Sequence, residues 1–189
     1  MEKIMDKQIP LKEAENEVEL ASRRIALLHL AFSRMLVAEF GEKRGEKLIA
    51  KAIKEYGRMV GTEVRAAVED QGLPLTPENY GVGSARRLPR IGMHEGVEEV
   101  EIAGEKRVRA FGCVMARVWK AYGEEKLGRF YCYVDPAKYM AYNPKFKLAH
   151  VKALPDGDDY CEYYLLKTSQ QEQADFQSDD SDWLYIDKC

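Results

Sequence analysis

The sequence lacks the features that mark several large classes of protein. No uninterrupted apolar run in its 189 residues approaches the roughly 18 residues of a membrane span. Near the start, Glu2, Lys3 and Asp6 interrupt the apolar core that a secretory signal needs. Basic residues do not form a stripe interleaved with aromatic ones, which argues against nucleic acid as the main ligand. We therefore expect a cytoplasmic protein with neither nucleic acid nor a membrane as partner.

Cysteine is scarce and widely spaced. The four cysteines contain no C-x-x-C pair, so the sequence signals neither a zinc ribbon nor a thioredoxin-type site. In a cytoplasmic protein these thiols are expected to be reduced. Cys113, Cys132 and Cys161 can each be a small buried apolar residue or a residue with a chemical role. Cys189 is assigned no function.

Apolar residues at helical spacing predict two long helices in the first part of the chain. The first is expected from near Pro10 to Gly41, and the second from about Glu42 to Gly72. A short connection between consecutive helices is typical of a helical hairpin. His29 falls within the first helix and is interpreted as a core or groove histidine rather than a catalytic one. The apolar stripe of the first helix consists of Val18, Ala21, Ile25, Leu28, Met35 and Leu36, and Leu30 and Val37 widen it.

After Gly72 the pattern changes to short elements. Thr76-Pro77-Glu78 predicts the start of a short helix, and 81–92 is expected to be a loop. Residues 130–133 are interpreted as an aromatic-rich strand or the end of an element. The other predicted elements are a hairpin over 97–102 and 107–111, helices over 115–122 and 135–142, and strands over 146–154 and 160–166.

These elements predict an α+β fold. An N-terminal helical hairpin is followed by antiparallel strands with short helices, all in a single domain over 1–167. Residues 168–189 are expected to form a polar, mobile tail, because 170–189 holds six acidic residues against one lysine. The apolar segment 183–186 is expected to dock on the domain or on a neighbouring subunit.

Cys132 and Asp135 lie three residues apart in an aromatic-rich region. A thiol just before a helix N-terminus has its pKa lowered by the helix dipole, whereas a neighbouring carboxylate raises it. The sequence therefore does not give the sign of the pKa shift of Cys132. The surrounding tyrosines fit either a ligand pocket or simple strand packing.

Three segments of this region resemble the C-terminal signature of a known family, the L-2-amino-thiazoline-4-carboxylic acid hydrolases. Cys113 resembles an earlier cysteine of that pattern, and Tyr56–Gly61 in the helical pair is also similar. The similarity extends over most of residues 20–165. The three segments are Tyr131-Cys132-Tyr133-Val134-Asp135, Tyr142-Asn143-Pro144 and Gly157-Asp158-Asp159-Tyr160-Cys161-Glu162-Tyr163.

The resemblance implies a hydrolase that opens a cyclic amidine, the 2-amino-thiazoline ring, to an N-carbamoyl cysteine. Protonation of a ring nitrogen makes the carbon between the sulfur and the two nitrogens electrophilic, and water or a thiolate adds before the ring sulfur leaves. On this basis Cys132 is the expected nucleophile or polariser and Asp135 the base or orienter. Cys113 is a secondary candidate. His94 and His150 are expected to move protons near pH 7.

The substrate carboxylate needs a cation, and Arg87 and Arg90 are the predicted partners because arginine binds carboxylates bidentately. Further expected substrate contacts are Tyr131, Tyr133, Asn143 and Cys161. No cofactor is expected.

Two alternatives stay open at this point. Cys113, Cys132 and Cys161 with a histidine could form a tetrahedral zinc site. A fold of this kind could also bind a small molecule without turning it over. Pairing of the long helices between chains, and with it a homo-oligomer, is open as well.

Overall fold

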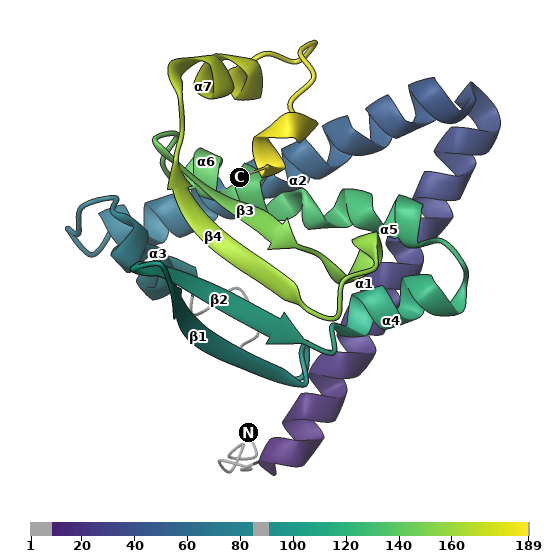
Figure 1. Ribbon diagram of the computed structural model, residues 1–189, viewed down its shortest axis with the longest axis horizontal. Coiled ribbons are helices and arrows are strands. Elements are labelled where there is room, and N and C mark those ends of the chain that lie inside the picture. Colours follow the sequence, from purple (N-terminus) through teal and green to yellow (C-terminus); the bar gives the residue numbers. More distant parts are fainter. Residues whose placement is uncertain (1–8, 85–90, 189) are drawn as a thin grey trace, which may run out of the picture.

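Two long helices begin the fold. In the computed structural model, which describes residues 9–84 and 91–188, α1 (Leu11–Phe40) and α2 (Glu42–Glu69) form a V (Figure 1). Gly41 joins them with a φ of +75°, a value that a residue with a Cβ rarely adopts. The predicted helical pair is confirmed. Among the described residues, no helix is long and apolar enough to cross a membrane.

The buried face of α1 differs from the predicted one. Ile25, Leu28 and Met35 of the predicted stripe are 41%, 58% and 64% exposed. The face packed against α4 and α5 carries small and polar residues instead, because it lies close to Trp119, whose Nε1 donates to the Ala26 carbonyl at 3.3 Å. The interpretation of His29 is confirmed, since it is 9% exposed with Nε2 2.8 Å from the Leu127 carbonyl oxygen. The buried residues of α1 are Ser22, Ala26, His29, Leu30 and Ser33.

The predicted strands form one antiparallel sheet. Its order is β1-β2-β4-β3, and every neighbouring pair is antiparallel. The predicted hairpin turns at Ala103 and Gly104, which both have positive φ. The strands are β1 (Gly96–Ile102), β2 (Glu105–Phe111), β3 (Phe146–Lys152) and β4 (Cys161–Lys167).

The short helices differ from prediction at α5 (Glu125–Cys132), which the sequence did not predict as a helix. Of the two interpretations of residues 130–133, the strand is wrong and the end of an element is confirmed, since Phe130, Tyr131 and Cys132 form the last turn of α5. They continue the helical spacing of Leu127, so that Phe130 and Tyr131 both pack on the helical core. Residues 81–92 were expected to be a loop, but α3 continues to Ser84. Residues 85–90 lie outside the described part of the chain. The helices are α3 (Pro77–Ser84), α4 (Val114–Ala121), α5 (Glu125–Cys132) and α6 (Val134–Tyr142).

Helix α6 packs between α2 and β3, and two glycines of α2 permit its close approach. A Cβ at Gly57 would lie 2.3 Å from the Ala137 Cβ, and a Cβ at Gly61 would lie 2.2 Å from the Lys138 carbonyl oxygen. Both distances are too short for real atoms. These two glycines, four residues apart on one face of α2, therefore fix the position of α6 under the sheet.

The C-terminal segment is packed on the domain, which corrects the expectation of a mobile tail. It contains α7 (Gln170–Gln177) and a 3-10 turn over Leu184–Asp187. Phe176, Trp183 and Ile186 are 1%, 3% and 0% exposed, so the segment adds to the core despite its acidic composition. Buried Lys147 holds it in place by donating to the carbonyls of Ile186 and Lys188, at 2.8 Å each.

Candidate active site

A cavity of about 370 Å³ lies between α2, α6 and the sheet. Side chains from α2, α4, α5, α6 and all four strands line it, and most of this lining is apolar or aromatic. A volume of this size suits a small ligand held by a few polar groups. The polar groups are four tyrosine hydroxyls together with His94, Cys113, Cys132, Asp135 and Lys138.

Asp135 and Lys138 form an ion pair at the cavity wall. They lie three residues apart in the first turns of α6, so both side chains project from the same side of the helix. Burial alone would raise the pKa of Asp135, but Lys138, His150 and His94 outweigh it and hold that pKa below its usual value. Burial would likewise lower the pKa of Lys138, yet Asp135 raises it above the usual value. The cavity therefore contains one carboxylate and one ammonium, both charged at neutral pH.

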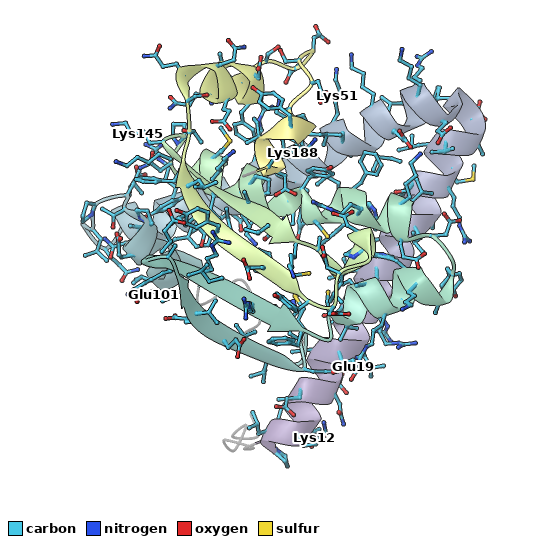
Figure 2. The ribbon with its side chains drawn as sticks, in the orientation of Figure 1. Lys12, Glu19, Lys51, Glu101, Lys145 and Lys188 are labelled. Carbon is cyan, nitrogen blue, oxygen red and sulfur yellow. The ribbon has the colours of Figure 1, made fainter. Side chains whose placement is uncertain are left out.

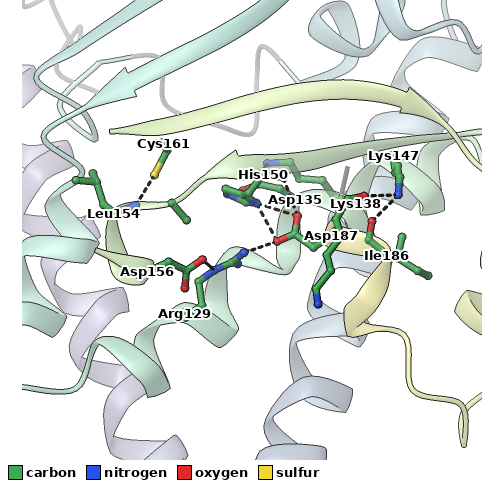
Figure 3. Close-up of polar contacts among 12 residues, drawn as sticks. Arg129, Asp135, Lys138, Lys147, His150, Leu154, Asp156, Cys161, Ile186 and Asp187 are labelled. Carbon is green, nitrogen blue, oxygen red and sulfur yellow. Dashed lines mark hydrogen bonds and ion pairs between the residues drawn. The ribbon is translucent and has the colours of Figure 1, made fainter. Parts of the chain in front are cut away.

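Behind this pair, charged groups continue toward the surface (Figure 3). His150 Nε2 lies 3.6 Å from Asp135 Oδ2, and His150 Nδ1 lies 2.9 Å from Asp187 Oδ1. Asp187 also accepts hydrogen bonds from the His150 backbone N–H at 3.0 Å and from Arg129 Nη2 at 2.6 Å. Arg129 Nε in turn donates to Asp156 at 2.8 Å. This chain fixes the imidazole behind Asp135, so His150 positions the carboxylate and is not itself part of the cavity lining.

The thiols near the cavity are held in their neutral form. Burial raises the pKa of Cys132 well above its usual value, although Arg129 opposes the shift. Burial also raises the pKa of Cys113, in spite of its place at the N-cap of α4. For Cys161 the pKa rises to about 11. The sign that the sequence left open for Cys132 is therefore upward, because desolvation exceeds any effect of the adjoining helix α6.

The zinc alternative gains no support from this geometry. Among residues 9–84 and 91–188, no group of three or more His, Cys, Asp or Glu side chains is arranged so that it could hold a metal ion. Cys113 and Cys132 line the cavity, whereas Cys161 does not. The Cys161 Sγ instead accepts a hydrogen bond from the Leu154 backbone N–H, with an N–S distance of 3.4 Å.

A comparison with protein-family models assigns the chain. The model described as L-2-amino-thiazoline-4-carboxylic acid hydrolase matches residues 21–165. The chain belongs to this family. The resemblance predicted from the cysteine- and tyrosine-containing segments is thus confirmed. No curated protein and no solved structure matches the chain significantly.

In this L-2-amino-thiazoline-4-carboxylic acid hydrolase family member, most of the predicted catalytic residues come together. Cys113, Cys132, Asp135 and His94 all line the cavity, although they come from three separate segments of the chain. Helix α6 presents Asp135 as its second residue rather than at the N-cap predicted from Asp135-Pro136. His150 contacts Asp135 from behind. The sequence pattern therefore pointed to residues that lie around one cavity, and their catalytic roles stay predictions.

The predicted substrate contacts are only partly brought together. Tyr131 lines the cavity, but Tyr133 lies beneath the guanidinium of Arg129, with its ring centroid 4.7 Å from the Arg129 Cζ. Asn143 ends α6 by donating to the Leu75 carbonyl at 2.7 Å. Arg87 and Arg90, the expected carboxylate partners, lie outside the described residues.

Several residues in and behind the cavity were not predicted from the sequence of this family member. Lys138 is the main one, and its three-residue spacing from Asp135 on a predicted helix was a usable signal. Tyr139 and Tyr163 belong to the aromatic-rich region but were not assigned to a site. Asp187 had no sequence signal, because it lies beyond the family match, in a segment expected to be mobile.

Proposed function

We propose that this protein hydrolyses a 2-amino-thiazoline-4-carboxylate to an N-carbamoyl cysteine in the cavity beside α6. The observation that carries the proposal is the buried pair of Asp135 and Lys138 in one small cavity. A protonated 2-amino-thiazoline carboxylate carries the complementary charges, a cationic amidine at one end of the ring and a carboxylate at the other. Family membership supports the same class of reaction.

In the proposed complex, the substrate replaces the direct contact between the two charged side chains. Asp135 accepts hydrogen bonds from the amidine nitrogens, and His150 keeps its carboxylate aligned. Lys138 binds the substrate carboxylate, the role that the sequence gave to Arg87 and Arg90. Burial raises the pKa of Tyr163, so its hydroxyl stays protonated and available as a hydrogen-bond donor.

His94 is the proposed proton carrier. Burial lowers its pKa below the ordinary value, so the imidazole is neutral at pH 7 and can accept a proton. Water forms a bond to the amidine carbon and gives a proton to His94. The tetrahedral adduct then breaks its carbon–sulfur bond as its hydroxyl becomes the ureido carbonyl. The departing ring sulfur takes back the proton held by His94, and the hydroxyl proton, which balances the one that charged the amidine, leaves to solvent. The product is a ureido group and a thiol, with the gain of one water.

Cys132 is assigned the role of a polariser rather than a nucleophile. A neutral, partly buried thiol is a poor nucleophile but can donate a weak hydrogen bond to the substrate or the adduct. Cys132→Ser should therefore lower kcat by no more than about tenfold, because serine keeps a donor at the same place. A loss beyond about 10³-fold would instead make the thiol the nucleophile.

The test is a turnover assay with L-2-amino-thiazoline-4-carboxylic acid, following the mass of the product and the released thiol. The wild-type protein should give a product one water heavier than the substrate, and Asp135→Asn should abolish it while leaving the circular dichroism spectrum unchanged. Asp180→Asn, on a side chain that is 93% exposed, is the matched control and should keep full activity. Calorimetric binding of the substrate without ring opening would refute catalysis and favour a binding module. The cytoplasmic location and the absence of a cofactor stay predictions.

A further inference from the structure

A stripe of apolar side chains runs along the outer side of α1 with the spacing of a coiled-coil seam, and it shares Val18, Ala21, Ile25, Leu28 and Met35 with the stripe predicted from the sequence. Ala14 and Val18 are half-buried, and the other members are exposed. Steps of three and four residues alternate through the whole stripe, and none of its side chains is buried. A strict 3.5-residue repeat keeps apolar residues in line along a helix when that helix supercoils with a partner. We call the stripe the α1 seam; it consists of Leu11, Ala14, Val18, Ala21, Ile25, Leu28, Phe32 and Met35.

The side of α1 that packs on its own domain is less apolar than the side left in water. Ser22, His29 and Ser33 are buried, whereas Phe32 and Met35 are each 64% exposed. At about 200 Å² for a fully exposed large side chain, the five large residues of the seam leave on the order of 600 Å² of apolar surface in water. That equals the largest patch found on ordinary monomers and approaches the roughly 800 Å² per partner of a stable interface. The seam therefore needs a partner.

The charges on α1 favour a second copy of the same helix in antiparallel orientation. Residues 11–22 hold four glutamates and one lysine, a net charge of −3, while 23–38 hold three arginines and no acidic residue, a net charge of +3. In an antiparallel pair each acidic half lies opposite a basic half, whereas a parallel pair sets like charges together. Arg34 and Glu19 already pair within the domain, with Glu124 and Arg117. Other charged residues of the two halves are exposed to solvent, among them Glu13, Glu17, Arg23 and Arg24.

The surroundings of α1 leave room for such a partner. Its N-terminal part, where Lys12 and Glu19 lie, extends past the sheet and α4 (Figures 1 and 2). With 30 residues, α1 is about 45 Å long, enough for four heptads. None of the seam residues lines the cavity beside α6, so association and catalysis can be measured separately.

We propose that the protein is a homodimer in which α1 pairs with α1 of a second copy, antiparallel and around a two-fold axis, through the α1 seam. Such an interface is isologous: the same surface of each copy covers the other, and no apolar surface of the seam remains in water. The proposal concerns assembly only and does not depend on the proposed hydrolysis.

Sedimentation analysis of the full chain tests the association. At about 100 μM, well above the micromolar range of a weak interface, the wild-type protein should sediment at twice the chain mass. Phe32→Glu should raise the dissociation constant at least about tenfold, because the new charge must lose its water in the seam. Met59→Glu, on a side chain of α2 that is 61% exposed, is the matched control and should leave the dimer unchanged. A wild-type monomer at this concentration, or a dimer unaffected by Phe32→Glu, overturns the proposal.

Charge reversal tests the orientation. Glu13→Arg combined with Glu17→Arg should weaken the antiparallel dimer, since both halves of α1 then become basic. Adding Arg23→Glu and Arg24→Glu restores opposite charges between the halves and should restore the dimer. In a parallel pair like charges face each other in all three proteins, but the net charges of the two halves fall from −3 and +3 to +1 and +3 and then to +1 and −1, so the repulsion decreases at each step. A dissociation constant that stays unchanged or falls on Glu13→Arg with Glu17→Arg would therefore overturn the antiparallel arrangement.

Discussion

Asp187 is the residue whose removal should most clearly test the description of the buried charges. Its carboxylate is 1% exposed and accepts hydrogen bonds from both the backbone and the ring of His150 and from Arg129. Asp187→Asn keeps the shape but removes the charge, and its amide nitrogen then meets other donors. Breaking a buried ion pair costs about 3–5 kcal/mol of stability. We expect the lower end, about 3 kcal/mol, because Arg129 keeps its contact with Asp156.

Urea denaturation followed by circular dichroism measures this loss. With a slope of about 2 kcal/mol/M, a loss of about 3 kcal/mol lowers the midpoint by about 1.5 M. The matched control is Asp180→Asn, in the same segment but 93% exposed, which should change the free energy of unfolding by less than about 0.5 kcal/mol. A loss below about 1 kcal/mol for Asp187→Asn would refute the reasoning, since the pair would then contribute no more than a surface contact.

Two further predictions concern the helical layer. Gly61→Ala should lower the free energy of unfolding by about 1–3 kcal/mol in urea denaturation, because the new Cβ has no space against α6. Gly81→Ala is the control and should leave the free energy of unfolding unchanged, because no atom lies within 4 Å of its new Cβ. Equal losses of stability in the two variants would contradict the close packing of α2 on α6. Burial lowers the pKa of Lys54 to about 8, against about 10.4 in an unfolded chain. Between these values the unfolded chain binds more protons, so Lys54 makes the free energy of unfolding rise with pH. The free energy of unfolding of the wild type minus that of Lys54→Met should therefore increase from about pH 8 to 10. A difference that does not change over this range would argue against the lowered pKa of buried Lys54.

Sequence periodicity predicted the elements of this fold better than their environments. The bounds of α1 and α2 followed from Pro10, Gly41 and Gly72, because these residues act on the local backbone. Which face of α1 is buried could not be predicted, since that depends on the close contact with Trp119, far away in the chain. Residues 130–133 were left open between a strand and the end of an element, because a short aromatic run fits a strand and a buried helix equally well.

In the candidate site, too, features set by neighbouring residues could be predicted and features set by long-range packing could not. Cys132 and Asp135 were found because they lie together in the sequence and in a family pattern. The neutral state of the Cys132 thiol could not be found, because burial is set by the packing of the whole domain. The role of Asp187 could not be predicted from the sequence, because the acidic composition of its segment predicted a mobile tail. The segment is held on the domain by its few apolar residues Phe176, Trp183 and Ile186, which are all buried.

The packing of the C-terminal segment also bears on how the protein is synthesised. The chain is made from its N-terminus, and a domain folds as a unit. The helical pair, the sheet and α6 are therefore synthesised before residues 170–188. Until then Arg129 and His150 lack Asp187, and Lys147 lacks the carbonyls of Ile186 and Lys188. The contacts that hold His150 behind Asp135 can thus form only after the C-terminal segment has been made, so the candidate site depends on a part of the chain that lies outside the family match.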